Sequence, residues 1–268
     1  MISQTVKNLI SVPKCVGCDE RLSPIASKNK HHGNVIFCPE CEAKWNISRS
    51  QMCKSCGKDA CGCTCFPSPV KKLQDEIPAI MFYHRDGDTV CERMIHHLKH
   101  RKNKQLLSFV SHELAIKIKE SLFKQGLSPS SCILTYIPRK GSSIGKYGFD
   151  QGREICFNTA KILEAQALPL FLRVGGKEQK KLNKRERAKN IKASVILNHN
   201  LSGFPRKYKS ASLREALNGR TVVIIDDVMT SGATLKHGVS LIREKSTNYP
   251  VFLACVAKTP IETKATVE

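Results

Sequence analysis

Short apolar runs alternate with amphipathic stretches along most of the chain from residue 77 onward. The apolar runs are too short for buried helices and predict strands at 80–83, 133–137, 168–174, 193–197, 221–225 and 251–257. Between them, apolar side chains recur every three or four residues and predict helices at 90–98, 106–118, 155–165 and 234–244. Strands that alternate with helices in this way predict an α/β fold, with a mainly parallel sheet and flanking helices on both faces.

The first 66 residues differ from this pattern, because they are rich in cysteine and show little helical periodicity. Prolines at positions 67, 69 and 78 follow, and proline removes backbone donors and discourages regular structure. We therefore predict two parts: a small cysteine-rich module at 1–68 and a larger α/β domain at 77–268.

The cysteines of this module are spaced like zinc ligands. Two C-x2-C pairs, nineteen residues apart, have the spacing of a zinc ribbon: Cys15, Cys18, Cys38 and Cys41. In a second set, Cys61 or Cys63 could complete the site with Cys65, and the set that we predict is Cys53, Cys56, Cys63 and Cys65. Free or disulfide-bonded cysteines are the alternative. Because four thiolates leave no open position, we expect one or two Zn²⁺ ions with a structural role.

The formal net charge of +21 is large for 268 residues, and eight zinc-bound thiolates would lower it only to roughly +17. Such an excess favours polyanionic partners, among them nucleic acids, anionic lipids and phosphorylated small molecules. The longest apolar runs are far shorter than the ~20 residues that span a bilayer, and the first residues lack the apolar core of a signal peptide. We expect no transmembrane segment and a cytoplasmic location.

The segment 222–235 joins a buried strand, two adjacent carboxylates, a turn of small and hydroxyl residues, and the start of a helix. Ligands of open α/β sheets bind at this end of the strands. Backbone N–H groups at a helix start can hold a phosphate, and glycine permits close approach of the backbone. The two acids need donors beside that phosphate, and the ring hydroxyls of a ribose 5-phosphate would supply them. The predicted binding residues are Asp226, Asp227, Thr230, Ser231, Gly232, Ala233 and Thr234.

A less specific interpretation of this segment is a strand followed by a helix that Asp227 or Thr230 caps. It is not a Walker A loop, because G-x4-G-K-[ST] does not occur in the chain, and this disfavours ATPase activity. At each position compared, the segment resembles the signature with which type I phosphoribosyltransferases bind phosphoribosyl pyrophosphate (PRPP). The resemblance implies a site for PRPP with Mg²⁺.

Two other segments extend this resemblance. Arg139, Lys140 and Gly141 follow the strand predicted at 133–137, and a loop in this position contacts pyrophosphate in type I phosphoribosyltransferases. By its order along the chain, the basic segment 177–192 matches a mobile loop that closes over PRPP, which makes Gln179 and Arg187 the candidate catalytic residues. The alternative for this segment is a solvated basic loop.

Further stretches resemble the ComF family of competence-associated proteins: Ile95-His-His-Leu-Lys99, Gly148-Phe-Asp-Gln151 and Gln179-x2-Leu-x3-Glu-Arg187-x2-Asn190. With the N-terminal cysteines, this resemblance covers nearly the whole chain. It implies a zinc ribbon followed by a type I phosphoribosyltransferase-like domain. Two features depart from the family pattern: Tyr147 stands where an arginine is common, and the second cysteine set is irregular.

The ComF resemblance implies a role in DNA uptake, with phosphoribosyl transfer to an unknown acceptor. The implied partners are PRPP or another ribose 5-phosphate, single-stranded DNA and a competence helicase. Two alternatives stay open: a non-catalytic module that binds single-stranded DNA, and a regulator that senses PRPP. His96, His97 and His100 share one predicted helix, and we expect them to be solvated or to contact phosphate.

Overall fold

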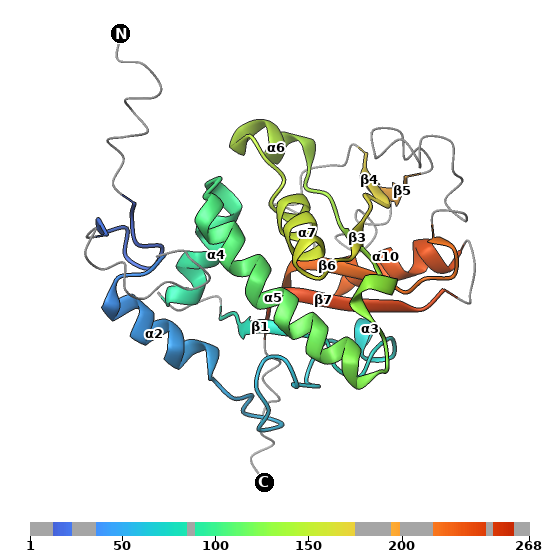
Figure 1. Cartoon of the computed structure of the whole chain (residues 1–268), viewed down its shortest axis with the longest axis horizontal. Coiled ribbons are helices and arrows are strands. Elements are labelled where there is room, and N and C mark those ends of the chain that lie inside the picture. The colour runs from blue at the N-terminus through green and yellow to red at the C-terminus, as the bar shows by residue number, and fades with distance from the viewer. Residues whose placement is uncertain are drawn as a thin grey trace.

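A computed structural model of the protein describes residues 13–22, 36–84, 89–174, 194–198, 217–244 and 249–259. Within these residues a five-stranded sheet has the order β1 (Ala79–Phe82), β7 (Val251–Lys258), β6 (Val222–Met229), β2 (Ile133–Tyr136) and β3 (Gln166–Ala167). Each neighbouring pair of strands is parallel (Figure 1). The predicted mainly parallel sheet is therefore confirmed.

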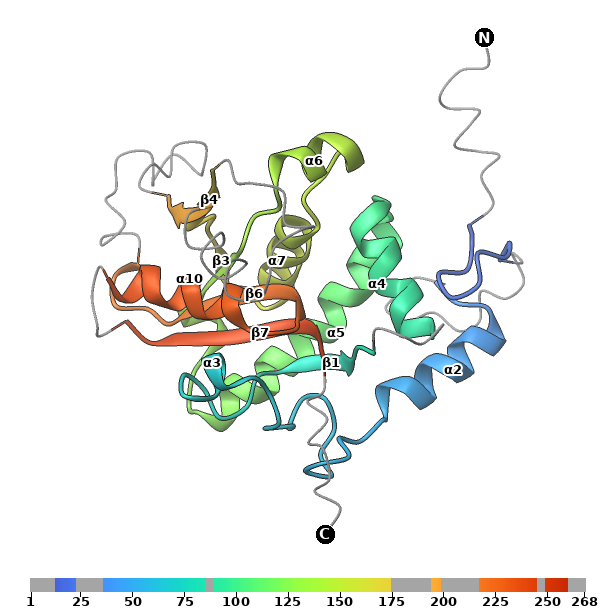
Figure 2. The ribbon, with the colours of Figure 1, turned by 180° about the vertical axis from the view of Figure 1, so that it is seen from behind.

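Helices cover both faces of this sheet. One face carries α4 (Val90–His100), α5 (Lys104–Lys124) and α7 (Gln151–Ile162), and the other carries α10 (Ala233–Arg243), as the view from behind in Figure 2 shows. Alternate side chains of β6 enter the two cores: Val223 and Ile225 on the first face, and Val222 and Ile224 on the second. The strands are apolar runs because both of their faces are buried.

Capping side chains set the starts of α4, α5 and α7. A capping box of Thr89 and Glu92 begins α4, and the side chain of Asn103 caps α5. The helix predicted at 155–165 begins four residues earlier, because Asp150 accepts hydrogen bonds from the backbone N–H groups of Gly152 and Arg153. The helical pattern thus predicts which side of each helix faces the core, and the capping side chains determine where these three helices begin.

The strand predicted at 168–174 is shorter than expected and lies outside the central sheet. The chain leaves that sheet after β3, and Pro169, which has no N–H to donate, follows closely. Only Phe171–Arg173 forms a strand, β4, and it pairs antiparallel with β5 (Val195–Leu197) in a separate two-stranded sheet. This small sheet lies near the C-terminal ends of the central strands (Figure 1).

The cysteine-rich segment contains a helix that the sequence pattern missed. α2 (Pro39–Arg49) follows Cys38 directly and buries only Cys41 and Trp45. Two buried positions in eleven residues are too few to show helical periodicity, so the sequence pattern did not indicate this helix. The Trp45 ring packs against the rings of Phe37 and Phe109, and Phe109 lies on α5.

The later half of the cysteine-rich segment packs on the other side of the sheet. Phe66 and Val70, which lies in α3 (Ser68–Lys71), join the buried cluster that contains Leu235 of α10 and Cys255 of β7. Buried residues therefore run continuously from the cysteine-rich segment into the α/β part, and the division at 68–77 stays a prediction. None of the helices that the structure describes is long and apolar enough to span a membrane.

Candidate functional site

The predicted site lies where β2 and β6 end side by side. Tyr136, the last residue of β2, pairs with Ile225, while β6 continues along β7 as far as Met229. The next two residues of β6, Asp226 and Asp227, therefore lie beyond the end of β2, and none of the described strands borders β6 on this edge there. This open edge is the position at which parallel sheets bind ligands.

The turn after β6 has the shape that a phosphate-binding loop needs. Gly232 has a φ of +67°, in the left-handed region that favours glycine, and it directly precedes α10. The N-cap residue Gly232 has no capping side chain, so capping by Asp227 or Thr230 is not found. The N–H of Ala233 donates to the Ser231 hydroxyl at 3.4 Å, a weak contact that an anion at the start of this helix could replace. Thr230 is exposed, while Ser231, Ala233 and Thr234 are partly buried around this turn.

The two carboxylates differ in their surroundings. The Asp227 Oδ2 atom accepts a hydrogen bond from Gln151 Nε2 at 2.9 Å and lies 3.7 Å from Lys99 Nζ. Asp226 is held more deeply, and burial, together with the charge of Asp227, raises the pKa of its carboxyl to about 7. Asp226 is therefore protonated more readily than an exposed aspartate.

The loop after β2 is held in place from three sides. The backbone N–H of Arg139 donates to Asp150 Oδ2 at 2.9 Å, and its Nη1 atom donates to the backbone oxygen of Lys99 at 2.7 Å. The guanidinium also lies 5.0 Å from the ring centre of Tyr147. Lys140 precedes α6 (Gly141–Tyr147), so Gly141 opens a short helix. Tyr147 thus offers an aromatic face to the Arg139 guanidinium.

Arg173 is a site residue that the sequence did not reveal. It comes from β4, its Nη1 atom donates to the backbone oxygen of Pro138 at 3.1 Å, and its charge is attracted to Asp226 and Asp150. Burial lowers the pKa of its guanidinium, although it remains a cation. A cavity of about 560 Å³ lies beside it, and its lining includes Arg139, Asp150, Phe171, Arg173 and Asn198.

Lys99 and Gln151 belong to stretches that resemble the ComF family, and the sequence predicted no role for either side chain. Lys99 precedes Asp227 by 128 positions and Gln151 precedes it by 76, yet both lie next to it, because α4 ends and α7 begins at this edge of the sheet. The predicted catalytic residues Gln179 and Arg187, with the rest of 177–192, lie outside the described residues. Their roles stay predictions.

The three histidines of α4 are in different environments. His97 is buried and its Nε2 atom lies 3.5 Å from Asp19 Oδ2, so the expected solvated or phosphate-contacting role is wrong for this residue. The rings of His96 and His100 lie 4.2 Å apart, and His100 packs on Tyr147 with ring centres 4.8 Å apart. Burial lowers the pKa of His97 and His100, so both are mainly uncharged near neutral pH.

The first cysteine set forms a cluster suited to a metal ion. The four sulfur atoms lie within 4.8 Å of one another: Cys15, Cys18, Cys38 and Cys41. The backbone N–H groups of Gly17 and Cys38 donate to the Cys15 sulfur at 3.3 and 3.2 Å, as they would to a thiolate. All thirteen cysteines are free, so the disulfide alternative is not found. Four sulfur ligands in a closed cluster fit a structural Zn²⁺.

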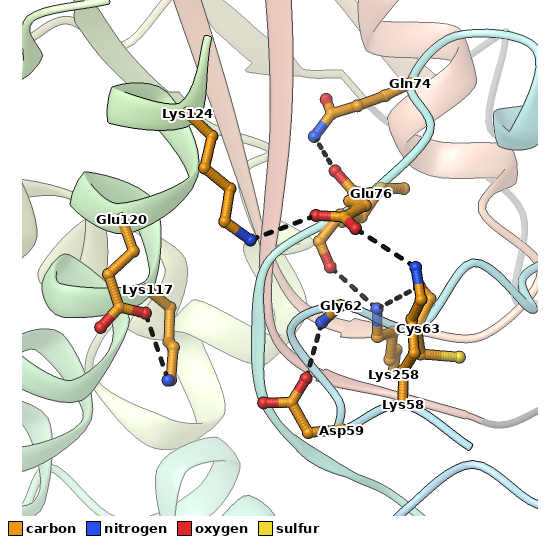
Figure 3. Close-up of polar contacts among 11 residues, drawn as sticks. Lys58, Asp59, Gly62, Cys63, Gln74, Glu76, Lys117, Glu120, Lys124 and Lys258 are labelled. Atoms are coloured by element: carbon orange, nitrogen blue, oxygen red, sulfur yellow. Dashed lines mark hydrogen bonds and ion pairs between the residues drawn. The ribbon is translucent and has the colours of Figure 1, made fainter. Parts of the chain in front are cut away.

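The second set is also brought together, and the structure selects its members: Cys53, Cys56, Cys63 and Cys65, again within 4.8 Å. Cys61 is not part of this cluster. It belongs to the turn in which Asp59 Oδ1 accepts a hydrogen bond from the N–H of Gly62 at 2.8 Å (Figure 3). The donor set fits Zn²⁺ as the first one does.

A buried lysine links this second cluster to the sheet. Lys258, the last residue of β7, is 1% exposed, and its Nζ atom donates to the backbone oxygens of Cys63 at 3.0 Å and Ile77 at 2.9 Å (Figure 3). Its ammonium also lies 5.7 Å from the ring centre of Phe66. Because a buried ammonium needs acceptors, the backbone around Cys63 and the end of β7 stabilise each other.

Comparison with protein families finds a match for the C-terminal part of the chain. The model of the phosphoribosyl transferase domain matches residues 164–267, which include Asp226, Asp227 and Gly232 but neither the loop at Arg139 nor the cysteine clusters. These residues therefore belong to a phosphoribosyltransferase-type domain. A search of curated proteins finds no match.

Solved structures that resemble this chain are also phosphoribosyltransferases. The Helicobacter pylori xanthine-guanine-hypoxanthine phosphoribosyltransferase aligns with a TM-score of 0.32 and 11% identity, over 60% of this chain and 88% of its own. The adenine phosphoribosyltransferase from Leishmania donovani aligns with a TM-score of 0.28 and 16% identity, over 57% of this chain and 68% of its own. The corresponding enzyme from Leishmania tarentolae has a TM-score of 0.28 and 15% identity, over 59% of this chain and 72% of its own.

Proposed function

We propose that this protein binds PRPP with Mg²⁺ at the open edge of β6 and transfers the phosphoribosyl group to an acceptor. One observation carries the proposal. Asp226 and Asp227 lie at that edge, immediately before the Gly232 turn and within the part that matches a phosphoribosyl transferase domain. Two acids beside an anion-binding turn suit a ligand that presents hydroxyls next to a phosphate.

Each part of PRPP has candidate partners in this arrangement. The phosphate on the ribose would accept hydrogen bonds from the N–H groups of the turn 230–234, and the ring hydroxyls would donate to Asp226 and Asp227. The pyrophosphate would lie toward Arg139, Lys140 and Gly141, which follow the adjacent strand. Mg²⁺, a hard cation that prefers oxygen ligands, would arrive with the pyrophosphate and neutralise charge as that group leaves.

Departure of pyrophosphate builds up negative charge, which fixed cations at the site can stabilise. Among the described residues, Arg139 and Arg173 line the same cavity: Arg139 directly follows Pro138, and Arg173 donates to the Pro138 backbone oxygen. We propose Gln179 and Arg187 as further contributors from the segment 177–192. Zn²⁺ at the two cysteine clusters would be structural, since each cluster already supplies four ligands.

The double substitution Asp226→Asn with Asp227→Asn should abolish PRPP binding in the presence of Mg²⁺. Two charge-assisted hydrogen bonds would be weakened, which corresponds to a loss of at least about 100-fold in affinity. Isothermal titration calorimetry would measure this loss. Unchanged affinity in the double variant would overturn the proposal.

A control for the loss of charge is the pair Asp75→Asn with Glu120→Gln. Asp75 lines a hollow beside Val251, the first residue of β7, and so lies at the opposite end of the strands. Glu120 is exposed on α5 and pairs with Lys117. This variant should bind PRPP as the unaltered protein does. Binding without release of pyrophosphate, for every acceptor tested, would favour the alternative of a PRPP sensor.

The cellular setting that we propose is DNA uptake in the cytoplasm, with single-stranded DNA and a competence helicase as partners. The net charge of +21 and the ComF-like stretches support this setting, and thirteen free cysteines suit a reducing compartment. Cations also lie over aromatic rings on the α6–α7 surface: Lys146 over Tyr147 at 5.1 Å and Arg153 over Phe157 at 4.9 Å. Such pairs suit unstacked bases and phosphates.

Fluorescence anisotropy with a labelled single-stranded oligonucleotide tests this setting. We expect binding at low salt whose logarithmic affinity falls linearly with the logarithm of salt concentration, because bound cations replace counterions on several phosphates. A double-stranded oligonucleotide of the same length is the comparison. No detectable binding at low salt would remove the DNA role and leave the PRPP proposal in place.

A further inference from the structure

The carboxylate of Asp227 is held by two side chains from distant parts of the chain. Gln151, the first residue of α7, donates from Nε2 to Asp227 Oδ2 at 2.9 Å, and Lys99 Nζ lies 3.7 Å from the same oxygen. The other oxygen, Oδ1, accepts from the backbone N–H of Val228 at 2.7 Å. Both oxygens are therefore engaged: Oδ1 by Val228 of its own strand, and Oδ2 by Gln151 and Lys99 from outside it.

The chemistry of the contact settles how the Gln151 amide is oriented. An ionised carboxylate only accepts hydrogen bonds, so the NH₂ group of Gln151 must face it. The side chain is 5% exposed, and its Oε1 atom has no hydrogen-bond partner among the described residues. A buried amide with one partner is a poor stabiliser, because an apolar side chain would fill the space without an unpaired acceptor. The hydrogen bond to Asp227 therefore explains the presence of glutamine at position 151 better than a contribution to stability does.

The same two segments also hold the loop after β2. Asp150, next to Gln151, accepts the backbone N–H of Arg139 at 2.9 Å, and the backbone oxygen of Lys99 accepts Arg139 Nη1 at 2.7 Å. The start of α7 and the end of α4 thus each contact both Asp227 and Arg139. This arrangement sets the separation between the carboxylate at the end of β6 and the loop at the end of β2.

We propose that Gln151 and Lys99 are positioning residues, which hold Asp227 in the orientation that accepts a ribose hydroxyl and tie it to the Arg139 loop. The inference rests on the proposed PRPP function and extends it to residues outside the phosphoribosyl transferase match. It assigns the Gly148-Phe-Asp-Gln151 stretch a physical role: Asp150 orders one ligand-facing segment, and Gln151 orders the other.

The test compares Gln151→Met with Gln151→Glu in calorimetric titrations with Mg²⁺ and PRPP. Methionine has a similar length and makes no hydrogen bond, so we expect affinity to fall about 10- to 100-fold. Glutamate places a second carboxylate against Asp227, and we expect a larger loss. Lys99→Met should also weaken binding, by about tenfold. The control Lys161→Met removes a lysine at the other end of α7, about 15 Å from Gln151, and should leave affinity unchanged.

A double-mutant cycle separates positioning from a general structural role. In an Asp227→Asn background, which retains Asp226 and so leaves measurable binding, Gln151→Met should change affinity less than twofold. The unfolding midpoint of Gln151→Met should not fall, because a buried and partly unpaired amide has been replaced by an apolar chain. If Gln151→Met does not fold, Lys99→Met replaces it in the cycle with Asp227→Asn, and the same comparison of affinities is made.

The outcomes are distinguishable. If the unaltered protein does not bind PRPP, the proposed function fails and this inference fails with it. If it binds, but Gln151→Met binds within twofold of it, the inference alone is overturned. The inference would also be overturned if Gln151→Met lowered the affinity for PRPP equally in the unaltered protein and in the Asp227→Asn background, because Gln151 would then act through another contact.

Discussion

Gly232→Ala should lower the free energy of unfolding by about 2–4 kcal/mol and weaken PRPP binding at least about tenfold. Two costs combine at this position. A non-glycine residue at a φ of +67° is strained. In addition, an added Cβ would lie 2.8 Å from both methyl carbons of Val70, which real Cβ contacts do not tolerate. The turn would have to shift away from Val70, and its N–H groups would no longer converge on one phosphate.

Gly126→Ala is the matched control for backbone strain. Gly126 has nearly the same φ, +68°, but nothing lies within 4 Å of an added Cβ. This variant should lose only about 1 kcal/mol and keep its affinity. Adding Val70→Ala to Gly232→Ala should restore part of the stability, because it removes the clash but not the strain. Chemical denaturation and calorimetry measure these effects, and equal stability of the two glycine variants would contradict the close approach to Val70.

Removal of metal from the second cysteine cluster should be the most damaging change outside the PRPP site. Cys63→Ser is expected to halve the zinc content and to destabilise the protein by several kcal/mol, since structural zinc sites contribute about 10–16 kcal/mol of binding free energy. Burial raises the pKa of the Cys63 and Cys65 thiols, so without a metal ion these two groups are neutral thiols near neutral pH.

Two contacts connect the second cysteine cluster to the turn at Gly232, so loss of the metal should also disturb that turn. The backbone oxygen of Cys63 is one of two acceptors for the buried Lys258, which pairs with Met229 at the end of β6. Val70, which follows the cluster closely in sequence, packs against Gly232. Loss of the metal should therefore weaken PRPP binding although the second cysteine cluster is not part of the site. We expect a fall of about tenfold or more, corresponding to one or two lost contacts.

The control is Cys61→Ser, because Cys61 lies outside the sulfur cluster. Mass spectrometry of metal content should find two zinc ions per chain in the unaltered protein and in Cys61→Ser, and one in Cys63→Ser. Thermal unfolding and PRPP titration of the same samples follow stability and function. A Cys61→Ser variant that loses zinc, or a Cys63→Ser variant that keeps two, would show that the ligand set is wrong.

Some features of the site could be predicted because their residues are consecutive in the chain. Asp226, Asp227 and Gly232 belong to one strand and turn, so their types and spacing already define an acid pair before an anion-binding turn. The paired cysteines are local in the same sense, since each C-x2-C turn presents two sulfurs whatever surrounds it. The parallel sheet also follows from local pattern, because strands buried on both faces must be apolar at every position.

Other features depend on which distant segments pack together, and the sequence alone does not contain that choice. The contacts of Lys99 and Gln151 with Asp227, and of Arg173 with Pro138, join residues far apart in the chain through the docking of α4, α7 and β4 around one end of the sheet. The choice of Cys63 over Cys61 is of the same kind, because it depends on which sulfur the folded turn aims at Cys53 and Cys56. By itself, the sequence determined the acid pair with the glycine turn after it, the cysteine pairs and the sheet. Only the tertiary structure decided which side chains contact Asp227, because side-chain partners are set by packing between segments and not by spacing within one.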